Sequence, residues 1–262
     1  MVKTNLKHMI IKNNKITKIQ KREAVRRMFE YSTPNWDFFL MLVLSAGIIS
    51  LGLLLNNTAV VIGGMLVAPL LFPILSLSMA IVMSDYKLLR RSSLVILQSI
   101  GLIILVSFFT SFLKINREIT FEITSRSIPS LAYFLIAVLS GIAASYSLLK
   151  PSLPETLPAV AISVALIPPL SVTGIALSFG NLNLAIGAFE LFALNLIGII
   201  FSALIIFSMF KFFEVKEEAE KEIKAEERII VKEAKEKKKE NIDQLTKQVK
   251  EAVEIIAEEK NK

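Results

Sequence analysis

The sequence predicts an all-α polytopic membrane protein, on three observations. Hydrophobic residues make up 53% of the 262-residue chain, and the mean hydropathy is +0.60. Charged residues concentrate at the two ends of the chain and in a few short links. A membrane-spanning helix needs roughly 20 mostly apolar residues, and six segments meet this requirement, at residues 36–55, 58–83, 94–113, 129–149, 157–179 and 184–212.

Residues 1–35 are predicted to form a basic amphipathic segment on the cytoplasmic face of the membrane. They contain nine lysines and arginines, which the positive-inside rule places on that face. Apolar residues recur among them at helical spacing from Ile16 to Phe29, as in a helix that lies in the membrane interface. We therefore expect this segment to bind anionic lipid headgroups. With six spans, we expect a multi-pass protein of the cell membrane with both termini in the cytoplasm.

The six spans are predicted to form two three-helix repeats, at residues 36–113 and 129–213, joined by an external link at residues 114–128. Superposing Pro69 on Pro168 also aligns the apolar segments before and after each proline. Each repeat has an odd number of spans, so the second repeat must enter the membrane from the opposite face. We therefore expect inverted repeats, related by an axis in the membrane plane.

Prolines interrupt the second and fifth spans at corresponding places. The first interruption contains Pro69 and Pro73, and the second contains Pro168 and Pro169. Proline lacks a backbone N–H and frees a carbonyl one turn earlier. In lipid such a group must be buried in protein or line a wet cavity. Interrupted helices in corresponding positions of two halves point to a transport site, so we expect both helices to be broken near mid-membrane and to bound that site.

The candidate substrate or ion pathway combines these prolines with small and polar residues near them and in the last span. Its residues are Gly63, Gly64, Pro69, Pro73, Ser76, Pro168, Pro169, Ser171, Thr173, Gly174, Glu190 and Asn195. The alternative for the small residues is close helix packing, which also favours glycine and serine in membranes.

Glu190 is an ionisable residue inside the last predicted span, where a charge is costly. One hypothesis makes it a proton or cation site that faces Asn195, Gln98 or the broken helices. The alternative is a structural carboxylate, protonated or hydrogen-bonded, or one that faces a shallow outer vestibule. For Gln98, Ser99 and Asn195 the alternative role is hydrogen bonding between helices.

Three ordered motifs resemble those of a known family. They are the stretch Val61–Ile74, with Gly63-Gly64 and Pro69; the stretch Leu157–Leu170, which ends in Pro168-Pro169-Leu170; and Asn195. Together they resemble the domain-of-unknown-function 389 family of bacterial and archaeal integral membrane proteins. The resemblance covers about residues 40–207 and implies no established activity.

The chain departs from that family in two respects. Some members carry a soluble amino-terminal domain, and residues 1–35 are too short to form one. The family pattern is usually apolar at position 190, where this chain has Glu190. This second departure weakens any family-wide role for the carboxylate.

Residues 214–262 are predicted to form a long cytoplasmic helix, because no proline or glycine occurs from Val215 to Glu259. Apolar residues follow spacings of three and four in its second part, at Ile242, Leu245, Val249, Ala252 and Ile256. Such a seam is typical of a short coiled coil. We therefore expect a homo-oligomer with these helices bundled together; the alternative is a single charged helix on the membrane surface.

The sequence favours transport over catalysis. It has no cysteine and one histidine, His8, and it lacks the common nucleophile, metalloprotease and phosphate-binding motifs. We therefore expect no enzyme, no cofactor and no metal site. The net charge of +7 lies mostly beside the membrane, which argues against nucleic acid as a partner. The first hypothesis is a transporter or channel for a small solute or ion, with its site between the two proline-broken helices. The alternative is a non-transporting membrane scaffold or sensor that acts through its basic face and helical tail.

Overall fold

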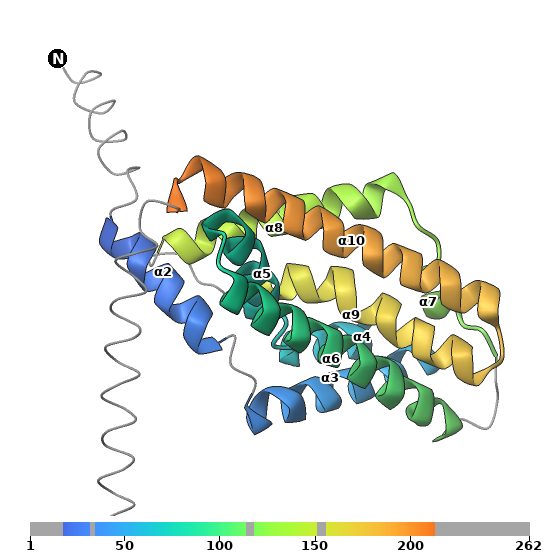
Figure 1. The fold of residues 1–262 in the computed structure, drawn as a ribbon. Coiled ribbons are helices and arrows are strands. Elements are labelled where there is room, and N and C mark those ends of the chain that lie inside the picture. The colour runs from blue at the N-terminus through green and yellow to red at the C-terminus, as the bar shows by residue number, and fades with distance from the viewer. Residues whose placement is uncertain (1–17, 32–34, 114–117, 151–155, 213–262) are drawn as a thin grey trace, which may run out of the picture. The chain divides into compact units, whose positions relative to one another are not determined.

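The computed structural model describes residues 18–31, 35–113, 118–150 and 156–212 (Figure 1). The chain divides into two compact units, Met1–Lys216 and Glu217–Lys262. The predicted carboxyl-terminal helix and its apolar seam lie outside the described residues, as does the first half of the predicted basic segment.

The described residues form helices and contain no β-strand. The elements are α2 (Lys18–Tyr31), α3 (Trp36–Leu54), α4 (Thr58–Val67), α5 (Leu71–Met83), α6 (Tyr86–Thr110), the 3-10 turn η1 (Ser111–Leu113), α7 (Phe121–Thr124), α8 (Leu131–Leu149), α9 (Thr156–Ser178) and α10 (Leu182–Met209). Within the described ranges, five helices are long and apolar enough to cross a membrane, and the bent pair α4 and α5 makes a sixth if it counts as one span. The prediction of an all-helical fold is therefore confirmed for the described residues, and their helices are apolar enough to be membrane-embedded.

The second predicted span is broken, as expected, and α5 is bent by 56° from α4. Ala68 has extended backbone angles, φ −76° and ψ 127°, because the ring of Pro69 disfavours the helical conformation of the residue before it. Pro73 lies in the first turn of α5, where a missing N–H costs nothing. The two prolines therefore end one helix and fit the start of the next.

The predicted break in the fifth span is wrong. The helix α9 runs from Thr156 to Ser178 with Pro168 and Pro169 inside it. A proline at position 169 leaves the Ala165 carbonyl without its helical donor, and the Asn195 side chain of α10 supplies a replacement, with Nδ2 to O at 2.8 Å. A donor from a neighbouring helix thus compensates for the bond that Pro169 removes.

Two turns at corresponding places in the two halves have the same construction. One joins α5 to α6 through Ser84 and Asp85, and the other joins α9 to α10 through Gly180 and Asn181. In each, the first residue has positive φ, 50° at Ser84 and 71° at Gly180. The second residue caps the next helix by accepting a hydrogen bond from the backbone N–H three residues on. Its own N–H donates to the carbonyl five residues back, at 2.9 and 3.0 Å.

The helix α9 lies at the centre of the bundle, in contact with α3, α4, α6, α8 and α10. The halves also exchange contacts, because α6 packs on α9 and α10 packs on α5. Two glycines allow close approach: a β-carbon at Gly64 would lie 2.6 Å from Cγ1 of Ile49, and one at Gly174 would overlap the Ile104 carbonyl oxygen. The positions of Gly64 and Gly174 therefore show the alternative role that we gave for the small residues, which is close helix packing.

The helix α2 packs against α5 and α8. Its Ala24, Val25 and Met28 side chains are buried, and Ser76 of α5 donates a hydrogen bond to the Met28 carbonyl at 3.1 Å. On the same helix, Glu23 accepts hydrogen bonds from Arg26 and Arg27. The apolar side of this segment therefore contacts protein, and Glu23 neutralises part of its positive charge.

Candidate functional site

Two cavities border α9 at the same level, on different sides of the helix. The larger has a volume of about 300 Å³, and we call it the polar cavity. Its walls come from α7 and the residues after it, α8, α9 and α10, through Phe121, Glu122, Ser125, Arg126, Tyr133, Ile136, Val164, Ala165, Pro169, Leu191 and Asn195. The smaller, which we call the apolar gap, has a volume of about 10 Å³ and lies among α5, α6, α9 and α10.

Asn195 lies in the wall of the polar cavity, deep within the bundle. It is thirteen residues into α10, about 20 Å along the helix. The residue is buried, and its Nδ2 donates to the Ala165 carbonyl that Pro169 leaves free. Its Oδ1 is buried and has no hydrogen-bond partner within the described part of the chain. An unsatisfied acceptor of this kind is costly unless a water, solute or ion binds it.

An ion pair lies at the other end of the polar cavity, between Glu122 and Arg126 on and just after α7. Both side chains are largely buried. Thr58 at the start of α4 donates to Glu122 Oε1 at 2.6 Å, and the Glu122 N–H donates to Asn56 Oδ1 at 3.1 Å. The short link helix is therefore tied to the turn between α3 and α4, and it brings one opposite-charge pair to the cavity without adding net charge.

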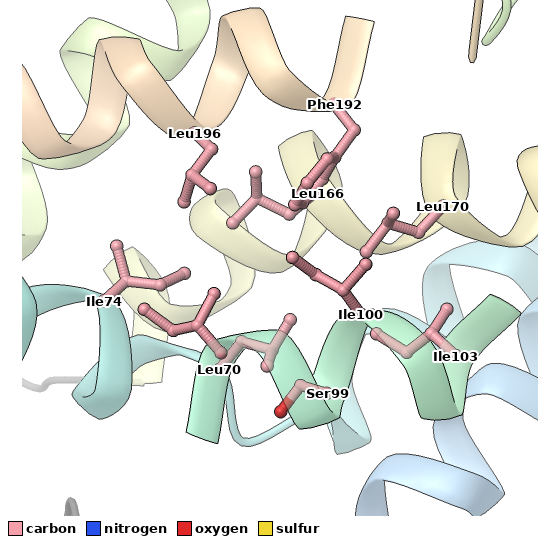
Figure 2. A pocket seen from close by; sticks show the side chains of 10 residues that line it. Leu70, Ile74, Ser99, Ile100, Ile103, Leu166, Leu170, Phe192 and Leu196 are labelled. Atoms are coloured by element: carbon pink, nitrogen blue, oxygen red, sulfur yellow. The ribbon is translucent and has the colours of Figure 1, made fainter. Parts of the chain in front are cut away.

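The apolar gap occupies the place where the two proline segments meet. Leu70 from the break lines this gap together with Leu166 and Leu170 of α9, and Figure 2 shows the labelled apolar side chains gathered around it. Ser99 is the one polar residue among its lining residues, and its hydroxyl donates to Val95 of its own helix at 2.8 Å. The crossing of the two segments is therefore closely packed and apolar.

The structure brings two of the predicted pathway residues together at the polar cavity, Pro169 and Asn195. Pro168 is buried within α9, and Pro69 and Pro73 lie at the bend between α4 and α5. None of these three lines either cavity.

The predicted small and polar residues have other contacts. Gly64 and Gly174 lie in close helix contacts, whereas Gly63 is exposed with open space around it. Ser76 donates to α2, and Thr173 donates to the Pro169 carbonyl of its own helix at 2.9 Å. The Ser171 hydroxyl is buried without a partner among the described residues.

Glu190 is exposed on the surface of α10 and lines neither cavity. Gln98 is likewise exposed, on α6. The expected arrangement, with Glu190 facing Asn195, Gln98 or the broken helices, is therefore not the arrangement that this structure shows.

The sequence interpretation missed Glu122, Ser125, Arg126 and Tyr133 as cavity residues. Tyr133 donates from its hydroxyl to the Ser125 carbonyl at 3.3 Å, which fixes α8 to the link. The available signal was a pair of opposite charges four residues apart in the short link that was predicted to be external, starting two residues after the capping residue Thr120. Such spacing places two side chains on one helical face, and here that face borders the cavity.

Comparison with known proteins places these features in a family. Residues 65–201, more than half of the chain, match the family described as Domain of unknown function (DUF389). An uncharacterized protein of Methanocaldococcus jannaschii is 33% identical over 172 residues, which cover 65% of this chain and 53% of that relative. This chain thus spans about half the length of the curated relative that it matches. No solved structure matches it. The bend at Pro69, the Pro168–Pro169 pair and Asn195 all fall within the matched residues, and the chain belongs to the DUF389 family.

Proposed function

We propose that this protein is a carrier or channel for a small polar solute or ion, with the polar cavity as one half of its path. A volume of about 300 Å³ is at the lower end of the range for small-molecule sites. The sequence predicted a site where the two proline segments cross. The proposed site lies instead on the other side of α9, in the polar cavity. The mechanism needs binding and conformational change, and it includes no catalytic step.

Asn195 is the observation that carries this proposal. Polar side chains inside membrane spans are costly and mark solute and ion pathways. Asn195 is buried at the cavity wall, beside a stretch of α9 whose backbone bonding is altered by two prolines. Its Oδ1 has no hydrogen-bond partner among the described residues. That oxygen can accept a hydrogen bond from a solute or coordinate a cation. Helix interruptions supply carbonyls to such sites in known transporters.

The proposal includes the inverted repeat. The exchanged contacts of α6 with α9 and of α10 with α5, and the matching turns at Ser84 and Gly180, support a pseudo-twofold relation between the halves. In carriers of this design, the two repeats adopt different conformations and exchange them during transport. The bent α4–α5 pair and the continuous α9 then represent those two conformations in one state of the cycle.

We also propose that the protein lies in the cell membrane with both termini in the cytoplasm. Lys21 and Arg22 of α2 add positive charge beside the first span, which the positive-inside rule places in the cytoplasm. Anionic headgroups are the matching partner. In this orientation Arg126 is external, which the positive-inside rule disfavours. The effect is small, because Arg126 forms an ion pair with Glu122.

The test is solute entry into proteoliposomes, followed by light scattering after osmotic shrinkage. The probes are glycerol, urea, sodium chloride and potassium chloride, each compared with protein-free vesicles. We expect faster reswelling for at least one probe. Asn195→Leu should slow it about tenfold, the effect of one lost hydrogen bond.

Asn183→Leu is the matched control, because it makes the same exchange at an exposed position near the start of α10. It should leave the reswelling rate unchanged. Rates equal to those of protein-free vesicles for all four probes would contradict the proposal, whatever the variants do.

The second candidate function is a non-transporting scaffold or sensor. The dry crossing of Leu70 with Leu166 and Leu170 favours it, because a solute path through that crossing is closed. The scaffold predicts no flux for any probe and no water at Asn195. Those two measurements separate the candidates.

A further inference from the structure

Among the five candidate spans of the described residues, α6 has the smallest buried share. In its most apolar window 22% of residues are buried, compared with 78% in α9. Its exposed side chains recur at spacings of three and four, so they lie on one side of the helix. We call this surface the α6 outer face, and its central residues are Leu94, Leu97, Gln98, Gly101, Leu105 and Phe109.

Gln98 lies in the uncharged part of this span, which begins after Arg91 and ends before Lys114. It is seven residues beyond Arg91, about 10 Å along the helix, and a hydrocarbon core is about 30 Å thick. The side chain is exposed and makes no hydrogen bond within the described part of the chain. Lipid tails offer no donor or acceptor, so a hydrogen bond to a neighbouring helix stabilises an amide within the hydrocarbon.

Gly101 lies three residues from Gln98 on the same face. A β-carbon added there would meet no atom within 4 Å, whereas one added at Gly64 or Gly174 would clash. Packing within the chain therefore explains why Gly64 and Gly174 are glycines, but it does not explain why residue 101 is one. A small residue beside a polar one on a membrane helix allows the backbone of another helix to approach.

We propose that the α6 outer face docks a second copy of this chain, with Gln98 bonded to Gln98 of the partner subunit across a twofold axis. The amide fits this partner because it carries both donors and an acceptor. A twofold interface places each residue near the axis opposite its own copy. The two amides satisfy each other, and Gly101 lets the two α6 helices come close.

The exposed surface of α10 is the competing face, since it presents Glu190. The two faces differ in coverage, since 44% of residues in the most apolar window of α10 are buried, compared with 22% in α6. The less covered helix also carries the self-complementary amide, so α6 is the proposed interface.

The experiment is oxidative cross-linking of single cysteines in the full chain in native membranes, which needs no prior removal of cysteine. Gly101→Cys and Leu97→Cys test α6. Ile197→Cys on α10 and Leu139→Cys on α8 are controls, with exposed fractions of 62% and 65% against 66% for Leu97. We expect covalent dimers at the α6 positions, in a yield that does not fall when the membranes are diluted with lipid. Yields at α6 no higher than at the controls would overturn the proposal, and dimers at Ile197→Cys alone would assign the interface to α10.

Gln98→Leu gives a second readout that does not depend on cysteine reactivity. In nanodiscs or detergent, its dimer dissociation constant should rise about tenfold as the paired amides are lost. Leu97→Ala, which trims an apolar neighbour without touching a polar group, should have a smaller effect. An unchanged dissociation constant for Gln98→Leu would contradict the assigned pairing.

Discussion

The helices α4 and α5 meet at a 56° bend around Pro69, whereas α9 continues through Pro168 and Pro169. The spacing of the prolines accounts for part of this difference. Pro69 and Pro73 are four residues apart, so one ends a helix and the other sits in the first turn of the next. Pro168 and Pro169 are adjacent and disturb a single turn. A proline pair is therefore compatible with either a bend or a continuous helix.

The helix that packs beside each proline segment accounts for the remaining part of this difference. Ser99 of α6 and Asn195 of α10 occupy matching positions, each fourteen residues after the capping residue of its helix. The short Ser99 side chain bonds to its own helix, but the longer Asn195 amide reaches the Ala165 carbonyl across the interface. A helix can therefore continue through a proline when a side chain of a neighbouring helix donates a hydrogen bond to the carbonyl that the proline leaves free.

The largest expected effects come from the glycines that set helix spacing in the two halves. Gly174→Ala should destabilise the protein by about 3 kcal/mol, because the new methyl meets backbone of α6. Gly64→Ala should cost about 1–2 kcal/mol, because an Ile49 side chain can give way in part. Unfolding free energies from detergent titration measure both.

Gly63→Ala is the matched control for Gly64→Ala. Its methyl would enter open space, and the gain in helix propensity should stabilise the protein by up to about 1 kcal/mol. Equal losses at Gly63 and Gly64 would contradict the assigned packing.

Asn195→Leu should cost about 2 kcal/mol, because it leaves the Ala165 carbonyl without a donor. In a Pro169→Ala background the backbone N–H of residue 169 returns and bonds that carbonyl. The cost of Asn195→Leu should then fall by about 1 kcal/mol. A double-mutant cycle on unfolding free energies measures this difference.

Pro168→Ala is the control background for that cycle, because it restores a donor to Val164 rather than to Ala165. It should leave the cost of Asn195→Leu unchanged. If the cost were the same in all three backgrounds, Asn195 would not compensate for Pro169.

Pro69→Ala should relax the bend in the first half, since Ala68 is no longer held out of the helical region. Straightening would lengthen the separation of spin labels at the exposed positions 62 and 81 by about 3 Å. Pro73→Ala should leave this distance unchanged, because that proline fits the first turn of α5. A Pro69→Ala distance equal to that of the parent would show that packing, rather than proline, maintains the bend.

The smallest expected effect concerns α2. The hydrogen bond from Arg26 lowers the pKa of Glu23, Arg27 acts in the same direction, and burial opposes them. A pKa lowered by folding stabilises the folded state above the ordinary pKa of the group, and this contribution is lost as pH falls through the lowered value. Because Glu23 is partly exposed, solvent screening keeps the contribution small.

Glu23→Gln should therefore lower the unfolding temperature slightly at pH 7 and leave it unchanged at about pH 3. Scans of both proteins at the two pH values measure the difference. An equal decrease at both values would assign the effect to packing and not to charge.

Much of the fold could be predicted from the sequence. The apolar segments and the bend at Pro69 depend on local chemistry, and each lies where its residues predicted it. The continuity of α9 could not be predicted, because it depends on a side chain thirty residues away in the sequence.

The site was predicted less well. Asn195 and Pro169 were recognised as pathway candidates, but they line one cavity with the link residues Glu122 and Arg126 only because of how the link packs against the bundle. The orientation of Glu190 depends on the rotation of α10 about its axis, and a span that is apolar on all sides does not predict that rotation.

The proposed solute path requires that water reach one side of α9 and not the other. Val164 lines the polar cavity, while Leu166, two residues on, lines the apolar gap. A membrane-impermeant thiol reagent, applied to membranes with both faces open, should label Val164→Cys and spare Leu166→Cys, and it should also spare Leu139→Cys on the exposed surface of α8. Protection of Val164→Cys to the same degree as Leu139→Cys would contradict a water-filled path at Asn195.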